Sequence, residues 1–502
     1  RTLMPLETAG KARISPIAIK PQMRIKAFAE QENEKIHEAT GVVLHKTGVR
    51  FPCQKALDIF AQAGADVDFK TEIVKIQPDL LVQTLAKAPA EFVMGSRGSQ
   101  VLDVNLDGTK IYGGTSGTGT VTVDLDTRKR RPSVKKDIAM MARISDYLPS
   151  ISFYWPMVAA RDCPTETIAL HELEAAFTCT EKHVHIVSCV DEKSAQYAVE
   201  MVGAIAGSKE RIKARPPLSL IASPISPLNH DNGVLEAALV FAAAGLPVGF
   251  AAMPVIGTTA PASIAGALVQ GNAEILSSIC LLQLACPGAP AFYPLFTAML
   301  NPFTGGISVS SETKYLFYAA TVQLGHYYNL PVMTGYGGSD APDPKGWNVG
   351  KDDAVDAFFS CATGPDMAPG LGLLEGYTLL YPEKLLLDDE IYQSVKLMAE
   401  GMPVETDALA LDEIMDVGPG GHYLDRDYTI RNVRRLWQPG ISHQWSAEKQ
   451  DFCDPLEAAV EKTRWILKNH KPEPIDEKTA AELNRIIDAA ENELVKRKTN
   501  GL

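Results

Sequence analysis

Short apolar runs alternate with longer stretches of helical periodicity through the middle of this chain. Eight runs of strand length occupy residues 110–114, 151–158, 183–189, 218–223, 248–255, 291–296, 332–336 and 367–371. Ten or more residues follow each run, with apolar positions three or four apart, the spacing of an amphipathic helix. This alternation predicts a parallel sheet, and eight strands is the number that closes a (β/α)8 TIM barrel.

The two ends of the chain follow other patterns. Residues 54–63 predict a helix, 67–76 a strand, and Pro78 opens a second helix, because the first helical residue needs no N–H. After residue 384 the alternation fades, and Asp454-Pro455 starts one of two closing helices. We therefore expect an α/β protein with a barrel at 110–384, an N-terminal α+β segment at 1–109 packed on it, and a mostly helical C-terminal extension at 385–502 that covers the barrel or serves assembly.

Serines precede two of the predicted barrel helices. Ser133 comes before a helix with Ile138, Met141 and Ile144 on one face, and Ser310 or Ser311 precedes another. Serine is a favoured N-cap, because its hydroxyl accepts a hydrogen bond from the first turn. We predict that these serines cap the two helices.

Composition narrows the classes of partner and compartment. The 48 Lys and Arg against 61 Asp and Glu give a net charge of −13, so neither nucleic acid nor an anionic membrane surface is expected as a partner. No uncharged apolar run reaches the roughly 20 residues of a membrane span, and no secretory signal is visible. The eight cysteines form no C-x-x-C pair. We predict a cytoplasmic protein with free thiols, and a homo-oligomer.

Glycine-rich turns follow several predicted strands. In a barrel, active sites lie at the carboxyl ends of the strands, which here include the turns at 113–119, 335–341 and 370–376. The first turn lacks the Gly-Lys-Ser/Thr ending of a phosphate-binding loop. We expect its small residues to make room for a large flat ligand. The residues predicted to face such a cofactor are Gly117, Gly119, Ser226 and Ser339.

Aromatic residues gather at the same strand ends. A ring of aromatic faces can hold a quaternary ammonium ion by cation–π attraction, although core aromatics give the same pattern. The candidates for such a cage are Phe153, Trp155, Tyr293, Phe296, Tyr336 and Trp347.

Charged candidates are fewer. Asp340 and Glu375 follow the seventh and eighth strands and are the candidate catalytic carboxylates, with helix capping or a salt bridge as the alternative. The candidates to bind a substrate carboxylate are Arg161, His171, His183 and Lys345. His183 and His185 point the same way along one strand, but no third ligand at suitable spacing accompanies them. We expect no bound metal.

Several of these segments together resemble the trimethylamine methyltransferase family of corrinoid-dependent enzymes. The resemblance runs from about residue 35 to 471 and is carried by GTG at 117–119, ARD at 160–162, PISPL at 224–228, NAEILS at 272–277, SDA at 339–341 and LE at 374–375. It implies a (β/α)8 barrel and a separate corrinoid protein as methyl acceptor. Archaeal trimethylamine members have pyrrolysine immediately before Ser-Asp-Ala. That position is Gly338 here, so the chain resembles the pyrrolysine-free members linked to glycine betaine.

The chemistry of demethylation agrees with a quaternary substrate. A quaternary ammonium expels a neutral tertiary amine when a nucleophile takes its methyl group, so the protein needs only to orient the methyl and exclude water. We predict a methyltransferase that moves a methyl group from a quaternary amine, glycine betaine first, to Co(I) of a corrinoid protein. The alternatives are carnitine, proline betaine, choline or trimethylamine as substrate, a non-catalytic betaine-binding or sensing barrel, and an aldolase or lyase using Lys182 or Lys345.

Overall fold

A closed barrel of eight parallel strands forms the centre of the protein. The computed structural model describes residues 16–335, 338–436 and 440–495. Each barrel strand pairs in parallel with the next, and the last pairs with the first. The strands are β7 (Ile111–Thr115), β10 (Phe153–Tyr154), β11 (His183–Ile186), β12 (Leu218–Ala222), β13 (Val248–Phe250), β15 (Ala291–Pro294), β18 (Val332–Met333) and β19 (Met367–Leu371). The predicted barrel is confirmed, with one strand in each of the eight predicted runs.

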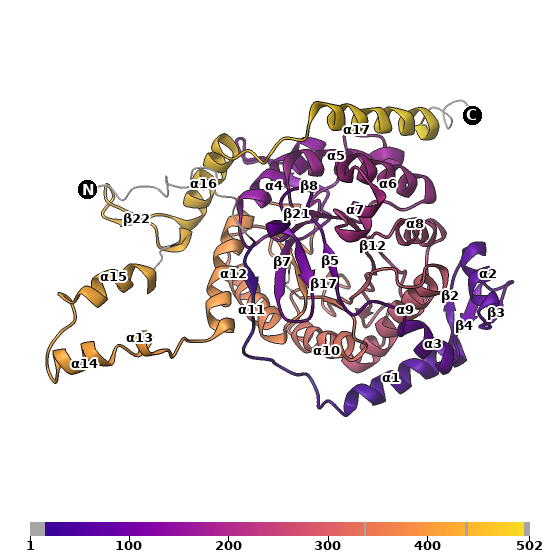
Figure 1. Cartoon of the computed structure of the whole chain (residues 1–502), viewed down its shortest axis with the longest axis horizontal. Helices are drawn as coiled ribbons and strands as arrows, with labels where there is room; N and C mark the ends of the chain where they lie inside the picture. The colour runs from indigo at the N-terminus through magenta and orange to yellow at the C-terminus, as the bar shows by residue number, and fades with distance from the viewer. Residues whose placement is uncertain (1–15, 336–337, 437–439, 496–502) are drawn as a thin grey trace.

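Helices surround the strands (Figure 1). They are α4 (Lys135–Tyr147), α5 (Ile168–Cys179), α6 (Glu192–Ala206), α7 (Lys209–Ala214), α8 (Asn232–Ala243), α9 (Ile264–Ala285), α10 (Thr313–Tyr327), α11 (Trp347–Thr363) and α12 (Lys384–Glu400). The side chains of Asp191, Asp231 and Ser263 accept hydrogen bonds from the first turns of α6, α8 and α9. Among the described residues only α9 is long and apolar enough to cross a membrane, and 72% of its apolar window is buried inside the protein, as in a core helix.

The N-terminal residues pack on one side and one end of the barrel. Helices α1 (Glu32–Val42), α2 (Gln54–Gln62) and α3 (Pro78–Leu85) contact α9, and β1 (Ala18–Ile19) pairs with β7. The predicted strand at 67–76 is wrong. It is a hairpin of β3 (Asp66–Asp68) and β4 (Ile73–Lys75), and β2 (Val49–Arg50) joins it at β4. A second hairpin, β5 (Phe92–Met94) and β6 (Val104–Leu106), packs Met94 and Leu106 into the apolar cluster inside the barrel.

Small sheets in the loops after the strands build up the opposite end, the barrel mouth. One sheet contains β8 (Val121–Val123), β9 (Arg130–Pro132), β20 (Leu373–Leu374) and β21 (Leu379–Leu380). Another contains β14 (Val255–Ile256), β16 (Ala298–Leu300) and β17 (Ile307–Ser308). These strands link the loops after β7, β13, β15 and β19 into one rim.

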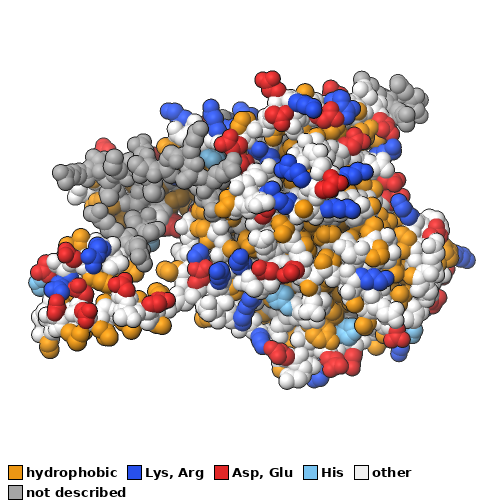
Figure 2. Space-filling view, in the orientation of Figure 1, with side chains coloured by type: hydrophobic (Ala, Val, Ile, Leu, Met, Phe, Trp, Pro, Cys, Tyr) orange, Lys and Arg blue, Asp and Glu red, His pale blue; other side chains and the backbone are white. Residues whose placement is uncertain are grey.

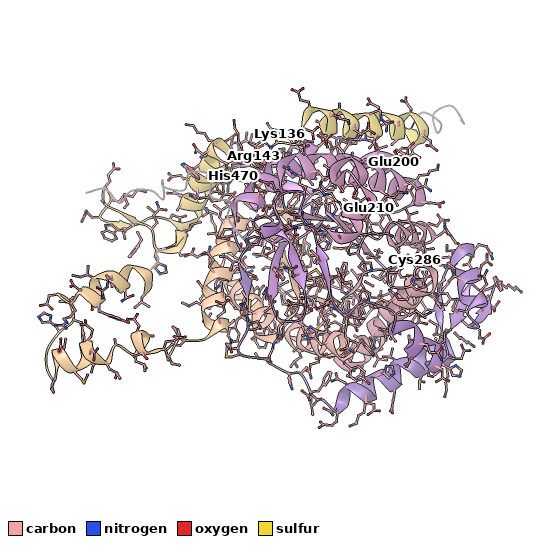
Figure 3. All side chains as sticks on the ribbon, viewed as in Figure 1. Lys136, Arg143, Glu200, Glu210, Cys286 and His470 are labelled. Atoms are coloured by element: carbon pink, nitrogen blue, oxygen red, sulfur yellow. The ribbon has the colours of Figure 1, made fainter. Side chains whose placement is uncertain are left out.

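The C-terminal residues divide into an arm and two packed helices. Helices α13 (Thr406–Leu409), α14 (Leu411–Val417) and α15 (Asp427–Leu436) stand away from the barrel in Figure 1. After the short hairpin of β22 (Trp445–Ser446) and β23 (Asp451–Phe452), α16 (Pro455–Asn469) packs on α4 and α12, and α17 (Glu477–Ala490) packs on α5 and α6. Arg143 donates to Leu467 and His470 pairs with Asp146, so both fasten α16 to α4 (Figure 3).

Candidate active site

A small, mainly apolar cavity lies at the mouth of the barrel. It has a volume of about 100 Å³ and is lined by residues that lie at the carboxyl ends of six of the eight strands or in the loops after them. The lining residues are Ser116, Gly117, Trp155, Met253, Phe296, Thr297, Gly335, Pro369, Gly370 and Tyr377. None of them carries a charge. The site can therefore enclose an apolar or aromatic-binding group, but its described wall offers no acid, base or metal ligand.

Glycines in the barrel strands allow large rings to fill the space below this cavity. A Cβ atom at Gly114 would overlap the ring of Phe153, and one at Gly249 would overlap Phe292. Both rings are fully buried beside His185. Because side chains alternate along a strand, the next inward position after Phe153 is Trp155, which contributes to the cavity wall. Phe153 and Phe292 thus form the floor of the cavity, and the aromatic residues of the cavity wall pack above them.

Two histidines and a serine form a polar chain within this floor. His183 Nδ1 lies 3.0 Å from the carbonyl oxygen of Gly95 and 3.1 Å from that of Pro216, so it carries the proton and donates. His183 Nε2 therefore accepts from the Ser219 hydroxyl at 2.8 Å, and Ser219 in turn accepts from His185 Nδ1. His185 Nε2 is buried and has no described hydrogen-bond partner. Burial lowers the pKa of His183 to about 4 and that of His185 well below its ordinary value, so both rings are neutral.

A histidine of this kind makes folding sensitive to acid. The unfolded chain binds a proton at His183 below about pH 6.5, whereas the folded chain resists it to about pH 4, so stability is lost as the pH falls through this window. His183→Asn keeps a donor near the two carbonyls but cannot titrate. Between pH 7 and pH 4 we expect the wild type to lose about 3 kcal/mol more unfolding free energy than the variant in urea titrations. Parallel curves for the two proteins would contradict this assignment.

The loops after β18 and β19 are joined backbone to backbone. Gly376 N donates to Ser339 O at 3.1 Å and Glu375 N donates to Ala341 O at 3.2 Å. From below, Lys314 Nζ donates to Gly338 O at 3.3 Å and pairs with buried Asp356 at 2.7 Å. These contacts fix Gly338 against the cavity wall. A Cβ atom there would lie 2.5 Å from Cε1 of Tyr377.

Tyr377 is the residue that closes this side of the cavity. It is held at φ +72°, in the left-handed region, and its hydroxyl accepts from Tyr318. Burial raises the pKa of Tyr377 above its ordinary value. The sequence reasoning missed Tyr377, because a tyrosine in a loop carries no periodic signal and its contact with Gly338 joins two separate loops. Met253 and Pro369 also line the cavity and were missed, although they lie within the runs predicted as strands at 248–255 and 367–371.

The two candidate carboxylates lie on the rim and outside the cavity lining. Asp340 accepts hydrogen bonds from Ser308 at 2.5 Å and Val309 at 3.1 Å, which ties its loop to β17. Glu375 pairs with Arg130 at 2.6 Å, between the loops after β7 and β19. Both carboxylates thus hold loops of the mouth together, Glu375 by the salt bridge that was its alternative and Asp340 by hydrogen bonds.

The structure distributes the other candidate residues widely. Gly117, Trp155 and Phe296 line the cavity, and Phe153 and His183 lie in its floor. Tyr293 points away from it and donates to Asn272 on α9, while Trp347 is 88% exposed at the start of α11. The remaining candidates are placed as follows: Arg161 is exposed after β10, Gly119 abuts Thr378, Ser226 donates to Glu274, Ser339 donates to Asp352, and Tyr336 lies outside the described residues.

No group of three or more His, Cys, Asp or Glu side chains in the described part of the chain is arranged to hold a metal ion. The two histidines of the floor are joined through Ser219 instead.

Comparison with known proteins gives one consistent family. The family model described as trimethylamine methyltransferase (MTTB) matches residues 6–495. A trimethylamine methyltransferase of Desulfitobacterium hafniense is 31% identical and covers 97% of each chain. One from Methanosarcina barkeri is 30% identical over 93% of this chain and 96% of its own. A glycine betaine methyltransferase of Desulfitobacterium hafniense is 28% identical over 92% of this chain and 96% of its own.

Proposed function

Because this chain belongs to the trimethylamine methyltransferase family, we propose that it transfers a methyl group from a quaternary amine, glycine betaine first, to a corrinoid carried by a separate protein. The observation that carries the proposal is the cavity wall of Trp155, Phe296 and Tyr377, which contains no charged side chain. Aromatic faces attract a quaternary ammonium ion, and the missing acid and base match a reaction that needs neither.

The proposed step transfers one methyl group from the substrate nitrogen to the corrinoid, and the electron pair of the C–N bond stays on nitrogen. The partner's corrinoid supplies the nucleophile as Co(I). The C–N bond breaks with its electrons left on nitrogen, so dimethylglycine departs with an uncharged tertiary amine nitrogen and its carboxylate unchanged, and no proton is needed. The chain's own residues enclose the trimethylammonium head, keep water out and aim one methyl toward the open mouth. Because Gly338 has no side chain, we assign this positioning to the aromatic residues of the cavity wall.

Glycine betaine is favoured over trimethylamine by the charge of the leaving group. Trimethylamine would expel an amide anion unless another group activated it, and the cavity wall contains no side chain to do so. The cytoplasmic location, the homo-oligomer and the absence of a bound metal remain our predictions.

The spectrum of the corrinoid tests the reaction directly. The protein, a reduced corrinoid carrier and glycine betaine should together convert the Co(I) spectrum to that of methyl-Co(III). Carnitine, proline betaine, choline and trimethylamine are tested in parallel. Conversion with trimethylamine alone would overturn the quaternary substrate, and conversion with none of them would overturn the methyltransferase. Betaine binding in calorimetry without any methyl transfer would instead support the binding or sensing barrel.

Removing one aromatic face should weaken substrate binding more than turnover. Trp155→Ala and Phe296→Ala each remove a cation–π contact of about 1–2 kcal/mol, so we expect KM to rise about 10-fold. Calorimetry with tetramethylammonium measures the same loss without the corrinoid. The control is Phe69→Ala, which removes a half-exposed aromatic ring from the N-terminal hairpin and should change neither value. Unchanged KM in both cavity variants would remove the aromatic wall from the site.

A further inference from the structure

The arm formed by residues 401–436 has no hydrophobic core of its own. None of its described side chains is buried, although it contains α13, α14 and α15. Arg426 pairs with Glu413 at 2.6 Å and with Asp416 at 2.9 Å, so α14 is fastened to the start of α15 by charge. Helices of 7 and 10 residues are too short to be stable in water by themselves. The arm therefore needs a surface from elsewhere.

The apolar side chains of the arm face solvent. Those between 42% and 85% exposed are Met402, Val404, Leu409, Leu411, Ile414, Met415, Tyr423, Leu424, Ile430, Val433 and Leu436. Leu411, Ile414 and Met415 share one face of α14, and Ile430 and Val433 share one face of α15. Figure 2 shows apolar side chains on the projecting arm. Monomers rarely expose contiguous apolar surface of this extent, which marks an interaction site.

We propose that the arms of two copies of this chain exchange across a two-fold axis, each packing its apolar faces against the arm and α12 of the other. The receiving surface is present on the same chain, because Leu397 and Met398 on the last turns of α12 are also exposed. A two-fold interface requires such a self-complementary patch, because the same surface of each copy contacts that of the other.

Charge supports a second copy as the occupant. Helix α14 contains Asp412, Glu413 and Asp416 and no basic residue, so it keeps a net negative charge after Arg426 pairs with two of these acids, whereas the sequence of α15 has three arginines and one aspartate. A two-fold axis between the arms would place α14 of one copy beside α15 of the other. The acidic helix would then lie against the basic helix at two symmetry-related contacts. A partner of a single sign would be repelled by one of the two helices.

The apolar area of the arm is also as large as the area that a stable dimer interface buries. Roughly ten side chains, with about 60–100 Å² each removed from water, give about 600–1,000 Å² per copy. A standard interface buries about 800 Å² per partner. The arm thus carries enough surface for an interface of standard size.

Light scattering on the purified protein tests the exchange. We expect the wild type at twice the 54.3 kDa of one chain, or at a larger even multiple. The double variant Ile414→Asp/Met415→Asp should halve that mass, because it buries charge in the interface but touches only exposed positions. The control is Val82→Asp on α3, equally exposed and off the arm, which should keep the wild-type mass. A monomeric wild type, or an arm variant with unchanged mass, would overturn the proposal.

Hydrogen exchange locates the contact. Amides of 406–417 and 427–436 should exchange at least 10-fold more slowly in the wild type than in the arm variant, while amides of α17 exchange equally in both. Equal exchange of the arm in the two proteins would show that another surface holds the assembly together, and would also overturn the proposal. If the arm instead binds a different protein, the purified wild type stays at 54.3 kDa.

Discussion

Replacing Gly338 by alanine should reduce kcat/KM for the methyl donor about 100-fold. The new Cβ atom would lie 2.5 Å from Cε1 and 2.8 Å from Cζ of Tyr377. Tyr377 forms part of the cavity wall and is hydrogen-bonded to Tyr318, so we expect its ring to be pushed into the cavity of about 100 Å³. A displacement of about 1 Å at a reacting group costs this much in an enzyme that works by positioning. Initial rates of corrinoid methylation measure the loss.

Two further variants separate this steric effect from a general loss of structure. Gly350→Ala, in the first turn of α11, meets no atom within 4 Å and should leave activity unchanged. Tyr377→Gly added to Gly338→Ala removes the colliding ring and suits the left-handed backbone, so it should recover part of the lost rate. If Gly338→Ala folds normally and retains full activity, the cavity is not where the substrate binds.

The barrel could be predicted from the sequence because its strands are buried on both faces. Such strands are continuous apolar runs, and the helices between them repeat at a different period, so all eight runs stand out. The strand predicted at 67–76 failed because residues 69–72 turn without Gly or Pro. Asp68 makes the turn instead, since its carboxylate accepts from the amides of Lys70 and Thr71.

Helix starts were less predictable than helices. Ser133 donates to Ala159 O instead of capping α4, and Asp137 accepts from the amide of Val134 at the helix start. Ser310 donates to Asp352 on α11, whereas the Ser311 hydroxyl accepts from the amide of Thr313, the first residue of α10, at 3.4 Å. For Ser133 and Ser310 a tertiary hydrogen bond took the hydroxyl that local preference would have used, and the sequence gives no sign of this competition.

The residues of the site also differ in how well the sequence predicts them. Trp155 and Phe296 could be placed near the mouth because strand alternation fixes which way they point. The surroundings of Asp340 and Glu375 depend on β17 and on Arg130, which are far away in the sequence. Tyr377 meets Gly338 only because two loops are joined by backbone hydrogen bonds. Contacts between loops set the shape of the cavity, and no periodicity reports them.

Replacing Lys384 by methionine should destabilise the protein by about 3–5 kcal/mol at pH 8. Lys384 is buried at the start of α12 and pairs with Asp353 at 2.8 Å and Asp388 at 2.5 Å. Burial opposes its charge, but these two carboxylates raise the pKa of Lys384 above its ordinary value. Removing the cation leaves two carboxylates facing each other away from water, and an uncompensated buried charge costs this much. Urea unfolding measures the loss.

The pH dependence of this loss identifies its cause. Burial already raises the pKa of Asp353 to about 6, and without Lys384 it rises further. A carboxyl with a raised folded-state pKa loses stability as the pH rises, so Lys384→Met should lose less at pH 5 than at pH 8. Adding Asp353→Asn should recover part of the stability at pH 8. Lys396→Met on the same helix breaks only the half-exposed pair with Glu400 and should cost less than about 1 kcal/mol. A loss independent of pH would point to side-chain packing instead of charge.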